Sequence, residues 1–310
     1  MDTRQLRYFV AIHDQGTLTG AADQERTAVS ALSYHLANLE AELGTALFTR
    51  KPRGMTPTAA GERLYPHARA ILRALEAAER DISSIVEDVA GEVSVGMAHS
   101  VVKAIGVDLV RHVLRDYPRL RLSLTEGLLG STLVHLLASE VDMALVYNPP
   151  ATPGLRARPV LEERLVCLGR ADVIGNSDAP LNFDEVLDFP IILLRRGASA
   201  RAVTDDAVLL RRLEERAQLQ LNSIVAIAGA LQAGLGCLVG PAFLMRDHLV
   251  AGHFRARPIE APELWRRLYL CEREDRPPTR ATEVTRDLVL SLLRQKVGSG
   301  DWDARLIDPG

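Results

Sequence analysis

A face of hydroxyl, phenol and imidazole side chains lies at helical spacing in the segment TAVSALSYHLANLE. Its members, called the polar helix face below, are Thr27, Ser30, Ser33, Tyr34 and His35. Such groups form hydrogen bonds with the edges of bases in a DNA groove. A face that merely contacts solvent is an equal alternative, although solvated faces usually carry more charge than this one.

A basic turn follows in the segment RKPRG, where Arg50, Lys51 and Arg53 surround Pro52. Lysine and arginine in such a turn bind phosphates and position a neighbouring helix without reading sequence. We therefore predict that the basic turn holds the DNA backbone, while the polar helix face contacts the bases.

Polar side chains also stand where predicted strands give way to helices, at HSVV, GST and LNSIV, and where the strand DMALVY ends. Helix N-termini and strand ends offer free N–H groups to a ligand. We predict that these residues line a ligand site in a cleft, although each reads equally well as a helix cap. The candidates are His99, Ser100, Ser131, Thr132, Tyr147, Asn222 and Ser223. Arginines in the segment RRGASAR favour an anionic ligand, with a solvated loop as the alternative.

The remaining reactive residues do not favour catalysis or metal binding. The eight histidines form no HxxxH or Cys/His cluster, and no carboxylate pair or Schiff-base lysine emerges. Cys167, Cys237 and Cys271 are widely spaced within apolar stretches, so we expect buried strand cysteines. We expect no catalytic residue, no metal and no cofactor. An enzyme built on the C-terminal part and a redox sensor that uses the cysteines stay as alternatives.

Length and composition bound the class of protein. A chain of 310 residues with 47% apolar and 25% charged residues is typical of two or three globular domains. The net charge of -3 argues against a protein that coats nucleic acid non-specifically. No apolar run approaches the roughly 18 residues that span a membrane, and the N-terminus lacks a signal-peptide core. We expect a cytoplasmic protein with no membrane partner.

A small helical module is predicted behind the polar helix face. Leucines recur at i, i+4, i+7 and i+11 between residues 32 and 43, which indicates a buried stripe on the opposite side of that helix. An earlier helix ends at Gly16, and Thr17 or Thr19 then caps a short second helix.

A long helix is predicted from Thr58, its cap, to about Val89. Apolar residues alternate steps of four and three along it, and charged residues flank both sides of this seam. Such heptads over more than three repeats favour pairing with a second chain. Pro66 is expected to kink the helix near its start. The seam comprises Leu64, Ala68, Ile71, Leu75, Ala78, Ile82, Ile85 and Val89.

The C-terminal two-thirds alternate between strand and helix patterns, in two successive sets. This alternation predicts a parallel sheet with helices on both faces, in two α/β lobes with a cleft between them. One long polar helix is expected through residues 200–216. The tail GSGDWDARLIDPG is expected to be disordered.

The segment LRYFVAI…GTLTGAA…SALSYHLANLEAELGTALFTRKPRGMTPTAAGERLY resembles the N-terminal winged helix-turn-helix of LysR-type transcriptional regulators. The resemblance runs without a gap over some sixty residues and continues more loosely to about residue 295. It implies a winged helix-turn-helix domain over 1–58, a linker helix over 59–90 that pairs subunits, and an effector-binding domain over 91–297. That domain would be similar to a periplasmic binding protein, with lobe I at about 91–160 and 265–297 and lobe II at about 161–264. A disordered tail would occupy 298–310.

The resemblance implies a regulator that binds a palindromic DNA operator as a homodimer or homotetramer, under control of a small-molecule effector. It places Ser100, Tyr147 and Asn222 in the effector pocket. RGMTPTAAGERLYPHARAILR and DMALVYNP are most similar to regulators of the nitrogen-assimilation-control type, some of which act without an obvious effector.

The chain departs from the family pattern at informative positions. Glu25 stands where the family usually has Leu, and Ala28, Val29 and Ser30 stand where it usually has Ser-Gln-Pro. Tyr34 replaces a frequent Arg. Ala28 cannot cap the helix, so Thr27 is expected to do so. The lost Gln and Arg remove two DNA contacts, so the operator sequence is expected to differ from that of relatives.

Overall fold

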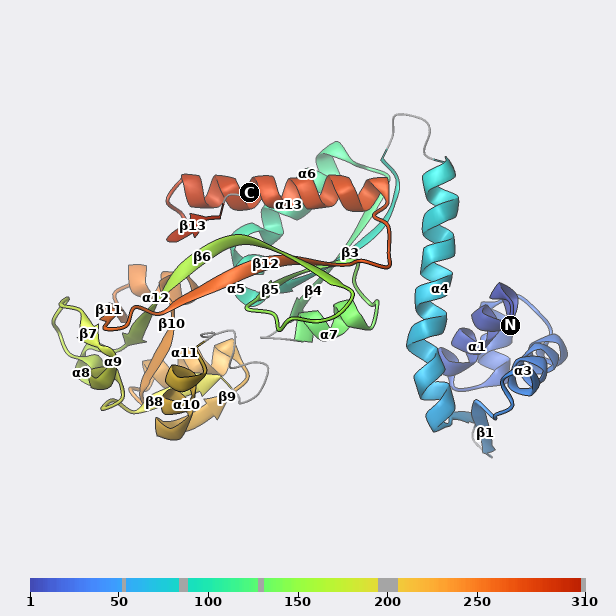
Figure 1. The fold of residues 1–310 in the computed structure, drawn as a ribbon, viewed down its shortest axis with the longest axis horizontal. Coiled ribbons are helices and arrows are strands. Elements are labelled where there is room, and N and C mark those ends of the chain that lie inside the picture. The colour runs from blue at the N-terminus through green and yellow to red at the C-terminus, as the bar shows by residue number, and fades with distance from the viewer. Residues whose placement is uncertain (52–53, 84–88, 128–130, 195–205, 308–310) are drawn as a thin grey trace. The chain divides into compact units, whose positions relative to one another are not determined.

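A computed structural model describes residues 1–51, 54–83, 89–127, 131–194 and 206–307, with the side chains of residues 76–83 and 194 left aside. It divides into two compact units, residues 1–87 and residues 88–310, each of which is described by itself (Figure 1).

Three helices and a hairpin build the first unit. The helices are α1 (Thr3–Gln15), α2 (Leu18–Gln24) and α3 (Val29–Leu43), and the hairpin joins β1 (Phe48–Lys51) to β2 (Gly54–Pro57). Gly16 ends α1 with a left-handed φ of 64°, and the Thr17 side chain caps α2, as predicted. The arrangement is a winged helix-turn-helix.

Helix α3 begins one residue later than predicted, because its cap position is Ala28 instead of Thr27. Its N-cap is Ala28, which offers no side-chain hydrogen bond, so the predicted capping role of Thr27 is wrong. The Thr27 N–H instead donates to the carbonyl oxygen of Ala22 at 3.0 Å, which fixes Thr27 in the turn before the helix. Leu32, Leu36 and Leu39 are buried as predicted, whereas Leu43 is 41% exposed because it lies in the last turn, beyond the core.

Helix α4 (Ala59–Ser83) runs without interruption through Pro66. The Thr58 side chain caps it, accepting from the N–H of Gly61 at 3.1 Å. Along the seam, Ala68 is buried in the core of the first unit, whereas Ile71 is 41% exposed. The start of the seam therefore packs in the core of the first unit, whereas the exposed Ile71 is available to contact another protein surface. Leu75 and Val89 are partly buried, and the seam positions between them lie outside the described side chains.

Two lobes build the second unit. Lobe I contains strands β3 (Gly91–Ala98), β4 (Leu120–Gly127), β5 (Met143–Tyr147) and β12 (Trp265–Arg273). Helical turns α5 (His99–Val101) and η1 (Val102–Gly106) lead into α6 (Val107–Asp116), and α7 (Ser131–Leu137) and α13 (Arg280–Gly298) complete the lobe. The helix expected from residue 101 is thus interrupted by the π-helical turn η1.

Lobe II follows the long strand β6 (Leu155–Gly169). Its other strands are β7 (Leu181–Asn182), β8 (Ile191–Leu194), β9 (Ala217–Leu221), β10 (Cys237–Pro241) and β11 (Arg255–Glu260). Its helices are α8 (Ala171–Ile174), α9 (Phe183–Val186), α10 (Ala207–Arg216), α11 (Ile224–Gln232), η3 (Ala242–Met245) and α12 (Arg246–Val250). Helix α10 begins after its cap Asp206 rather than at residue 200. Arg195, Arg196 and Arg201 lie outside the described residues.

The strand order is β4-β3-β5-β12-β6-β10-β8-β9. Most other strand pairs within each lobe are parallel, as predicted, but β12 and β6 are antiparallel to each other, β12 is antiparallel to β5, and β6 is antiparallel to β10 and β11. The sheet is therefore mixed rather than parallel, because β6 and β12 carry the chain between the lobes in opposite directions. Strand β6 pairs with β12 up to Arg164 and with β10 from Leu165 onward.

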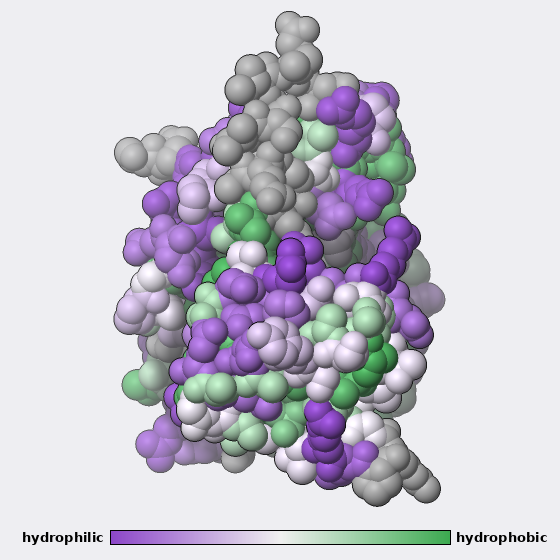
Figure 2. Space-filling view, turned by 90° about the vertical axis from the view of Figure 1, so that its right-hand side faces the viewer, coloured by the Kyte–Doolittle hydropathy of each residue, from purple (hydrophilic) through white to green (hydrophobic). Residues whose placement is uncertain are grey.

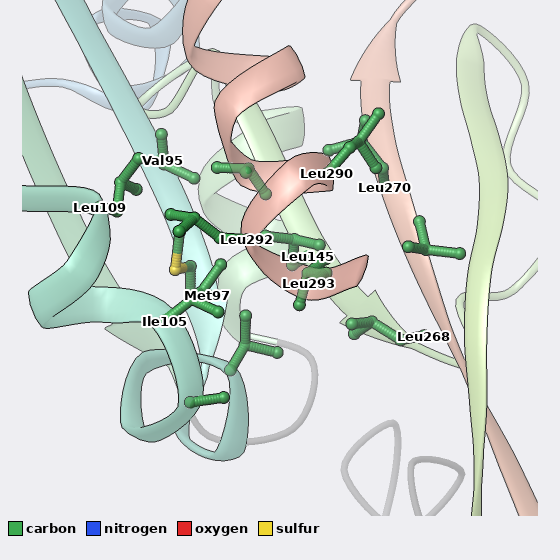
Figure 3. Close-up of a cluster of buried hydrophobic side chains, with 14 of the residues drawn as sticks. Val95, Met97, Ile105, Leu109, Leu145, Leu268, Leu270, Leu290, Leu292 and Leu293 are labelled. Carbon is green, nitrogen blue, oxygen red and sulfur yellow. The ribbon is translucent and has the colours of Figure 1, made fainter. Parts of the chain in front are cut away.

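Helices cover both faces of the lobe I strands (Figure 1). Met97 and Leu145 point to the face covered by α6 and α13, where Leu109 and Leu293 meet them in one buried cluster (Figure 3). The alternate residues of β5, with Cys271 of β12, meet α7 on the opposite face. Successive side chains of each strand point to opposite faces of the sheet, so each strand contributes to two buried clusters. Among the described helices none is long and apolar enough to cross a bilayer.

The tail after α13 is ordered through Ile307, so the predicted disorder of residues 298–310 is wrong over residues 298–307. Trp302 is only 1% exposed, and β13 (Ala304–Leu306) pairs antiparallel with β6. A buried indole and a strand partner supply the apolar contact and backbone hydrogen bonds that a disordered tail lacks. Residues 308–310 lie outside the described range.

Candidate DNA-binding face and ligand site

The polar helix face of α3 is presented to the outside of the first unit. Ser30 is exposed, Ser33 is half-buried and Tyr34 is 65% exposed. His35 packs edge-on against Tyr34, with ring centroids 5.6 Å apart, and against Tyr8 of α1 at 5.3 Å. The phenol of Tyr34 is therefore held from behind by a second ring while it points outward. This gives it a fixed direction for a base contact.

The start of α3 adds two features that sequence reasoning assigned no role. Because Ala28 has no capping side chain, the first N–H groups of α3 have no side-chain acceptor from that cap. Such a helix N-terminus attracts phosphate. Val29 beside it is 41% exposed, so an apolar group lies where a thymine methyl can be contacted.

The basic turn is tied to the polar helix face by a direct contact. The Arg50 guanidinium on β1 donates to Ser33 Oγ at 3.0 Å. Lys51 at the end of β1 is exposed, and Arg53 lies outside the described residues. The predicted division of tasks is thus less sharp for Arg50, which lies at both surfaces.

Gly54 explains why the hairpin is rigidly placed. Its φ is 138°, and a Cβ there would lie 2.3 Å from the carbonyl oxygen of Gly16. The next residue, Met55, donates its N–H to the same oxygen at 2.7 Å. The wing therefore docks on the α1–α2 turn through backbone atoms.

Figure 2 looks onto the first unit, whose visible surface is mostly hydrophilic with apolar residues interspersed.

Two of the predicted ligand-site residues meet in lobe I. Ser100 Oγ and the Tyr147 hydroxyl share a hydrogen bond at 3.1 Å, and both side chains are buried. The guanidinium of Arg266, from β12, donates to Ser100 Oγ at 3.3 Å and lies 3.7 Å above the Tyr147 ring. The Arg266 guanidinium thus occupies the space next to the Ser100 and Tyr147 hydroxyls.

Glu163 of β6 neutralises that cation. Its Oε1 accepts from Arg266 Nε at 2.7 Å and forms an ion pair with a terminal nitrogen of the same guanidinium at 2.5 Å. Its Oε2 accepts from Trp302 Nε1 at 2.7 Å. Burial raises the pKa of Tyr147 well above its ordinary value, and the charge of Glu163 adds to this effect. Burial opposes the charged form of Arg266, yet Glu163 outweighs it and the pKa of Arg266 is raised.

Sequence reasoning missed Arg266, Glu163 and Trp302, although a signal was present for the first two. Glu163 is in phase with the buried residues Leu161 and Leu165, and Arg266 is in phase with Leu264 and Leu268. A charged residue on the inward phase of a strand is buried, and buried charges require partners.

The other candidates do not join this group. His99 Nδ1 lies 2.6 Å from Glu126 Oε1 at the start of α5. In the other lobe Asn222 is exposed, and Ser223 serves as the N-cap of α11.

At the junction of β4 and α7, Thr132 is buried and Ser131 opens the helix. A Cβ at Gly127 would lie 2.4 Å from Ser131 Oγ, so this junction is closely packed. The structure therefore joins two of the seven predicted residues directly.

The cysteines are poor candidates for redox sensing. All three are buried and free. The neighbouring Cys237 thiol and burial raise the pKa of Cys167 well above its ordinary value, and burial raises the pKa of Cys271 to about 12. A thiol, rather than a reactive thiolate, is therefore expected at neutral pH. Among the described residues, no group of three His, Cys, Asp or Glu side chains is placed to hold a metal.

Comparison with known proteins agrees with both units. The family model for bacterial regulatory helix-turn-helix proteins of the lysR family matches residues 3–62, and that for the LysR substrate binding domain matches residues 87–294. The nitrogen assimilation regulatory protein nac of Klebsiella aerogenes is 34% identical over 265 residues, covering 85% of this chain and 86% of the relative. Its counterpart in Escherichia coli is 34% identical over 242 residues, covering 78% of each chain.

Solved structures share the fold. A full-length variant of OxyR from Pseudomonas aeruginosa superposes with a TM-score of 0.70 at 21% identity and 95% coverage of both chains. Full-length CbnR in complex with its target DNA gives 0.63 at 20% identity, covering 95% of this chain and 99% of the other. ArgP from Mycobacterium tuberculosis gives 0.68 at 18% identity, covering 94% and 97%.

Proposed function

Because the chain belongs to the LysR family of bacterial transcriptional regulators, we propose that it binds a palindromic operator as a homodimer or homotetramer in the cytoplasm. A small molecule bound in the two-lobed domain would control it. Catalysis is not part of this proposal, since the buried site of lobe I is closed by an internal ion pair. Following the relatives named for nitrogen assimilation, we propose target genes in that process.

The observation that carries DNA recognition is the contact between Arg50 and Ser33. Through it the wing and the recognition helix α3 form one continuous surface, with the outward phenol of Tyr34 next to it. Lys51 contributes an exposed cation at the end of β1. We assign phosphate contact to Lys51 and base contact to Ser30, Ser33 and Tyr34.

Operator binding measured by fluorescence anisotropy over a range of salt concentrations tests this assignment. The DNA upstream of the chain's own gene is the first probe. Lys51→Ala should weaken binding about equally on all sequences and reduce the slope of log K against log salt by about one. Tyr34→Ala should change the preferred bases, with a cost of about 1–3 kcal/mol at the affected position.

Arg294→Ala is the matched control, because it removes an exposed cation from the second unit. It should leave both the affinity and the salt slope unchanged. Absence of sequence-specific DNA binding by the unaltered chain at low salt would refute the proposed function. A changed base preference in Lys51→Ala, with none in Tyr34→Ala, would refute the assignment of roles.

Two exposed apolar helix faces support a homodimer. On α6, Val107 and Leu114 are each 71% exposed and Val110 lies between them on the same face. On α11, Val225 is 83% exposed, next to the exposed Ala226. One face belongs to each lobe, so a two-fold axis can place α6 of one subunit on α11 of its partner, twice. Unpartnered apolar faces of this kind mark interaction surfaces.

The surroundings of Ser100 do not favour a simple anion as the effector. The guanidinium nearest Ser100 is already neutralised by Glu163, so a simple anion at that position would compete with a buried carboxylate. We therefore propose that an effector binds beside the Ser100–Tyr147 pair and acts by displacing or reinforcing the Arg266–Glu163 ion pair. To control the regulator it must bind one lobe arrangement better than the other.

A further inference from the structure

The segment that follows α13, residues 299–307, lies across the junction of the two lobes and is called the C-terminal strap. Its side chains and backbone contact lobe I, lobe II and the strand that connects them. In Figure 1 it lies beside β6, with β13 labelled.

The strap is fixed to lobe II by stacking and by an arginine. The Trp302 ring stacks on Phe243 of η3, with centroids 5.1 Å apart and an interplanar angle of 21°. Arg246, the first residue of α12, donates to the backbone oxygen of Asp301 at 2.7 Å. Phe243 and Arg246 follow β10 of lobe II in the chain, and Phe243 packs in the same buried cluster as the lobe I strands. The strap therefore contacts lobe II where the two lobes join.

Lobe I and the connecting strand hold the strap from the other side. Lys296 of α13 lies 3.8 Å from Asp301 and 3.3 Å from Asp108 of α6. Strand β13 pairs with β6, with Ala304 opposite Glu163. Because β12 occupies one edge of β6, the strap occupies the other. The strap is therefore a structural link between both lobes.

Glu163 joins the strap to the ligand site. One of its oxygens accepts from Trp302 and the other from Arg266, whose guanidinium contacts Ser100 and Tyr147. If Trp302 leaves, Glu163 Oε2 loses its donor in a buried environment, and an unsatisfied buried acceptor is costly. The arrangement of Arg266 over Tyr147 thus depends on the strap being docked.

The surroundings of the strap suit reversible docking. A cavity of about 230 Å³ lies beside Asp301, lined by charged groups that include Lys103, Asp247 and Lys296. The carboxyl of Asp301 is held by Ser299 and Arg246, which lower its pKa, and it is partly exposed to solvent. Ion pairs of this kind are weak individually, so water or an ionic ligand can replace them.

We propose that the C-terminal strap is a tethered ligand of the two-lobed domain: docked Trp302 holds one lobe arrangement through Phe243 and Glu163, and its undocking switches operator affinity. The inference rests on the proposed function, since operator affinity is its output. It concerns a segment to which that function gives no role.

The chain's two tryptophans allow the docked state to be observed directly. In a Trp265→Phe background, Trp302 is the sole indole, and its emission should be that of a buried ring. Ending the chain after Gly298 removes the strap. We expect this truncation to change operator affinity by at least about fivefold, the lower end of common allosteric coupling. A synthetic peptide of residues 299–307 added in trans should reverse the change.

Trp302→Phe separates the two contacts of the indole, because it keeps a ring against Phe243 and removes the donor to Glu163. It should also shift operator affinity by about fivefold or more. Asp303→Asn, at an exposed strap position, is the matched surface control. Val289→Ala, in the core of lobe I, is the stability control: it should lower Tm without altering operator affinity.

Solvent-exposed emission from Trp302 in the intact chain would overturn the docked strap. A folded truncated chain with unchanged operator affinity would overturn its regulatory role. If the truncated chain does not fold, Trp302→Phe decides: a shift in affinity beyond that of Val289→Ala supports the inference, and an equal affinity overturns it. Failure of the intact chain to bind any operator is a separate result, which refutes the proposed function and leaves the docking test standing.

Discussion

At the scale of single residues, the group most dependent on its partners is the Glu163 carboxylate, which is fully buried and accepts two hydrogen bonds. One comes from Arg266, which also forms an ion pair with it, and one from Trp302. Desolvation of two charges is expensive, and their mutual attraction compensates only when geometry and hydrogen bonding are good. Removing one partner leaves the other charged and unpaired. Each of the three residues therefore depends on the other two.

Arg266→Ala should destabilise the second unit by about 3–5 kcal/mol, because it leaves Glu163 as an uncompensated buried charge. Arg267→Ala is the matched control. Arg267 pairs with Glu162 at 3.3 Å on the same two strands, but its side chain is 57% exposed. The control should cost at most about 1 kcal/mol. Urea unfolding followed by circular dichroism measures both; equal losses in the two variants would show that the buried pair is not an energetic centre.

Residue-level prediction from the sequence succeeded where a pattern is local and failed where a partner is distant. Helix phase predicted the exposed Tyr34, and strand ends singled out Ser100 and Tyr147, but the hydrogen bond between these two was not predicted. Thr27 failed as a cap because its N–H bonds to the carbonyl oxygen of Ala22, which places it in the turn before the helix. The partners of Glu163 come from β12 and from the strap, and no spacing along the chain encodes such distances.

At the scale of elements, the junction of the wing and α4 depends on one glycine. A Cβ at Gly61 would lie 2.3 Å from the carbonyl oxygen of Leu47, a backbone atom that has little freedom to move. Thr58 reinforces the junction, since its hydroxyl donates to the carbonyl oxygen of Ala46 at 2.8 Å. The first turn of α4 therefore packs directly on the residues that lead into the wing.

Gly61→Ala should destabilise the first unit by about 1–3 kcal/mol, the usual cost of forced overpacking. Helix propensity alone predicts the opposite, a gain of about 1 kcal/mol. Gly229→Ala in α11 is the matched control, because nothing lies within 4 Å of its added Cβ. It should be neutral or stabilising. Thermal unfolding and operator affinity report the result, and a gain in Tm for Gly61→Ala would contradict the packing described.

Most elements were predictable because apolar periodicity of 3.6 or 2 is recorded in each segment. The helices α1 to α4 and the strands β3 to β5 follow it closely. The direction of β6 and β12 was not predictable from periodicity, because an antiparallel and a parallel strand share the same alternation. The tail was wrongly predicted to be disordered for a different reason: its sequence is mostly polar and small, and the burial of Trp302 depends on contacts that exist only in the folded domain.

At the scale of the whole molecule, the proposed dimer requires α6 and α11 to lose solvent together. Leu114→Glu should raise the dimer dissociation constant by about tenfold or more, because a carboxylate is expensive to bury without a partner. Adding Val225→Lys should restore part of the affinity by supplying that partner across the interface. Sedimentation velocity measures the mass, which is 33.9 kDa for one chain.

Val134→Glu is the control for this experiment, since Val134 is 64% exposed on α7, outside both helix faces. It should leave the dimer intact. Loss of the dimer in Val134→Glu but not in Leu114→Glu would place the interface elsewhere on the second unit.

The ribbon formed by β6 and β12 has a mechanical consequence. Strand β6 carries the chain from one lobe to the other, and its pairing with β12 is broken by a single irregularity between Leu268 and Tyr269. Two strands joined by a ladder of hydrogen bonds resist separation more than they resist a change in their relative twist. Neighbouring strands differ in twist by about 10–35° across known sheets, and a bulge locally increases the twist. We therefore expect an effector to act on this domain by rotating one lobe about the other, around the paired strands β6 and β12.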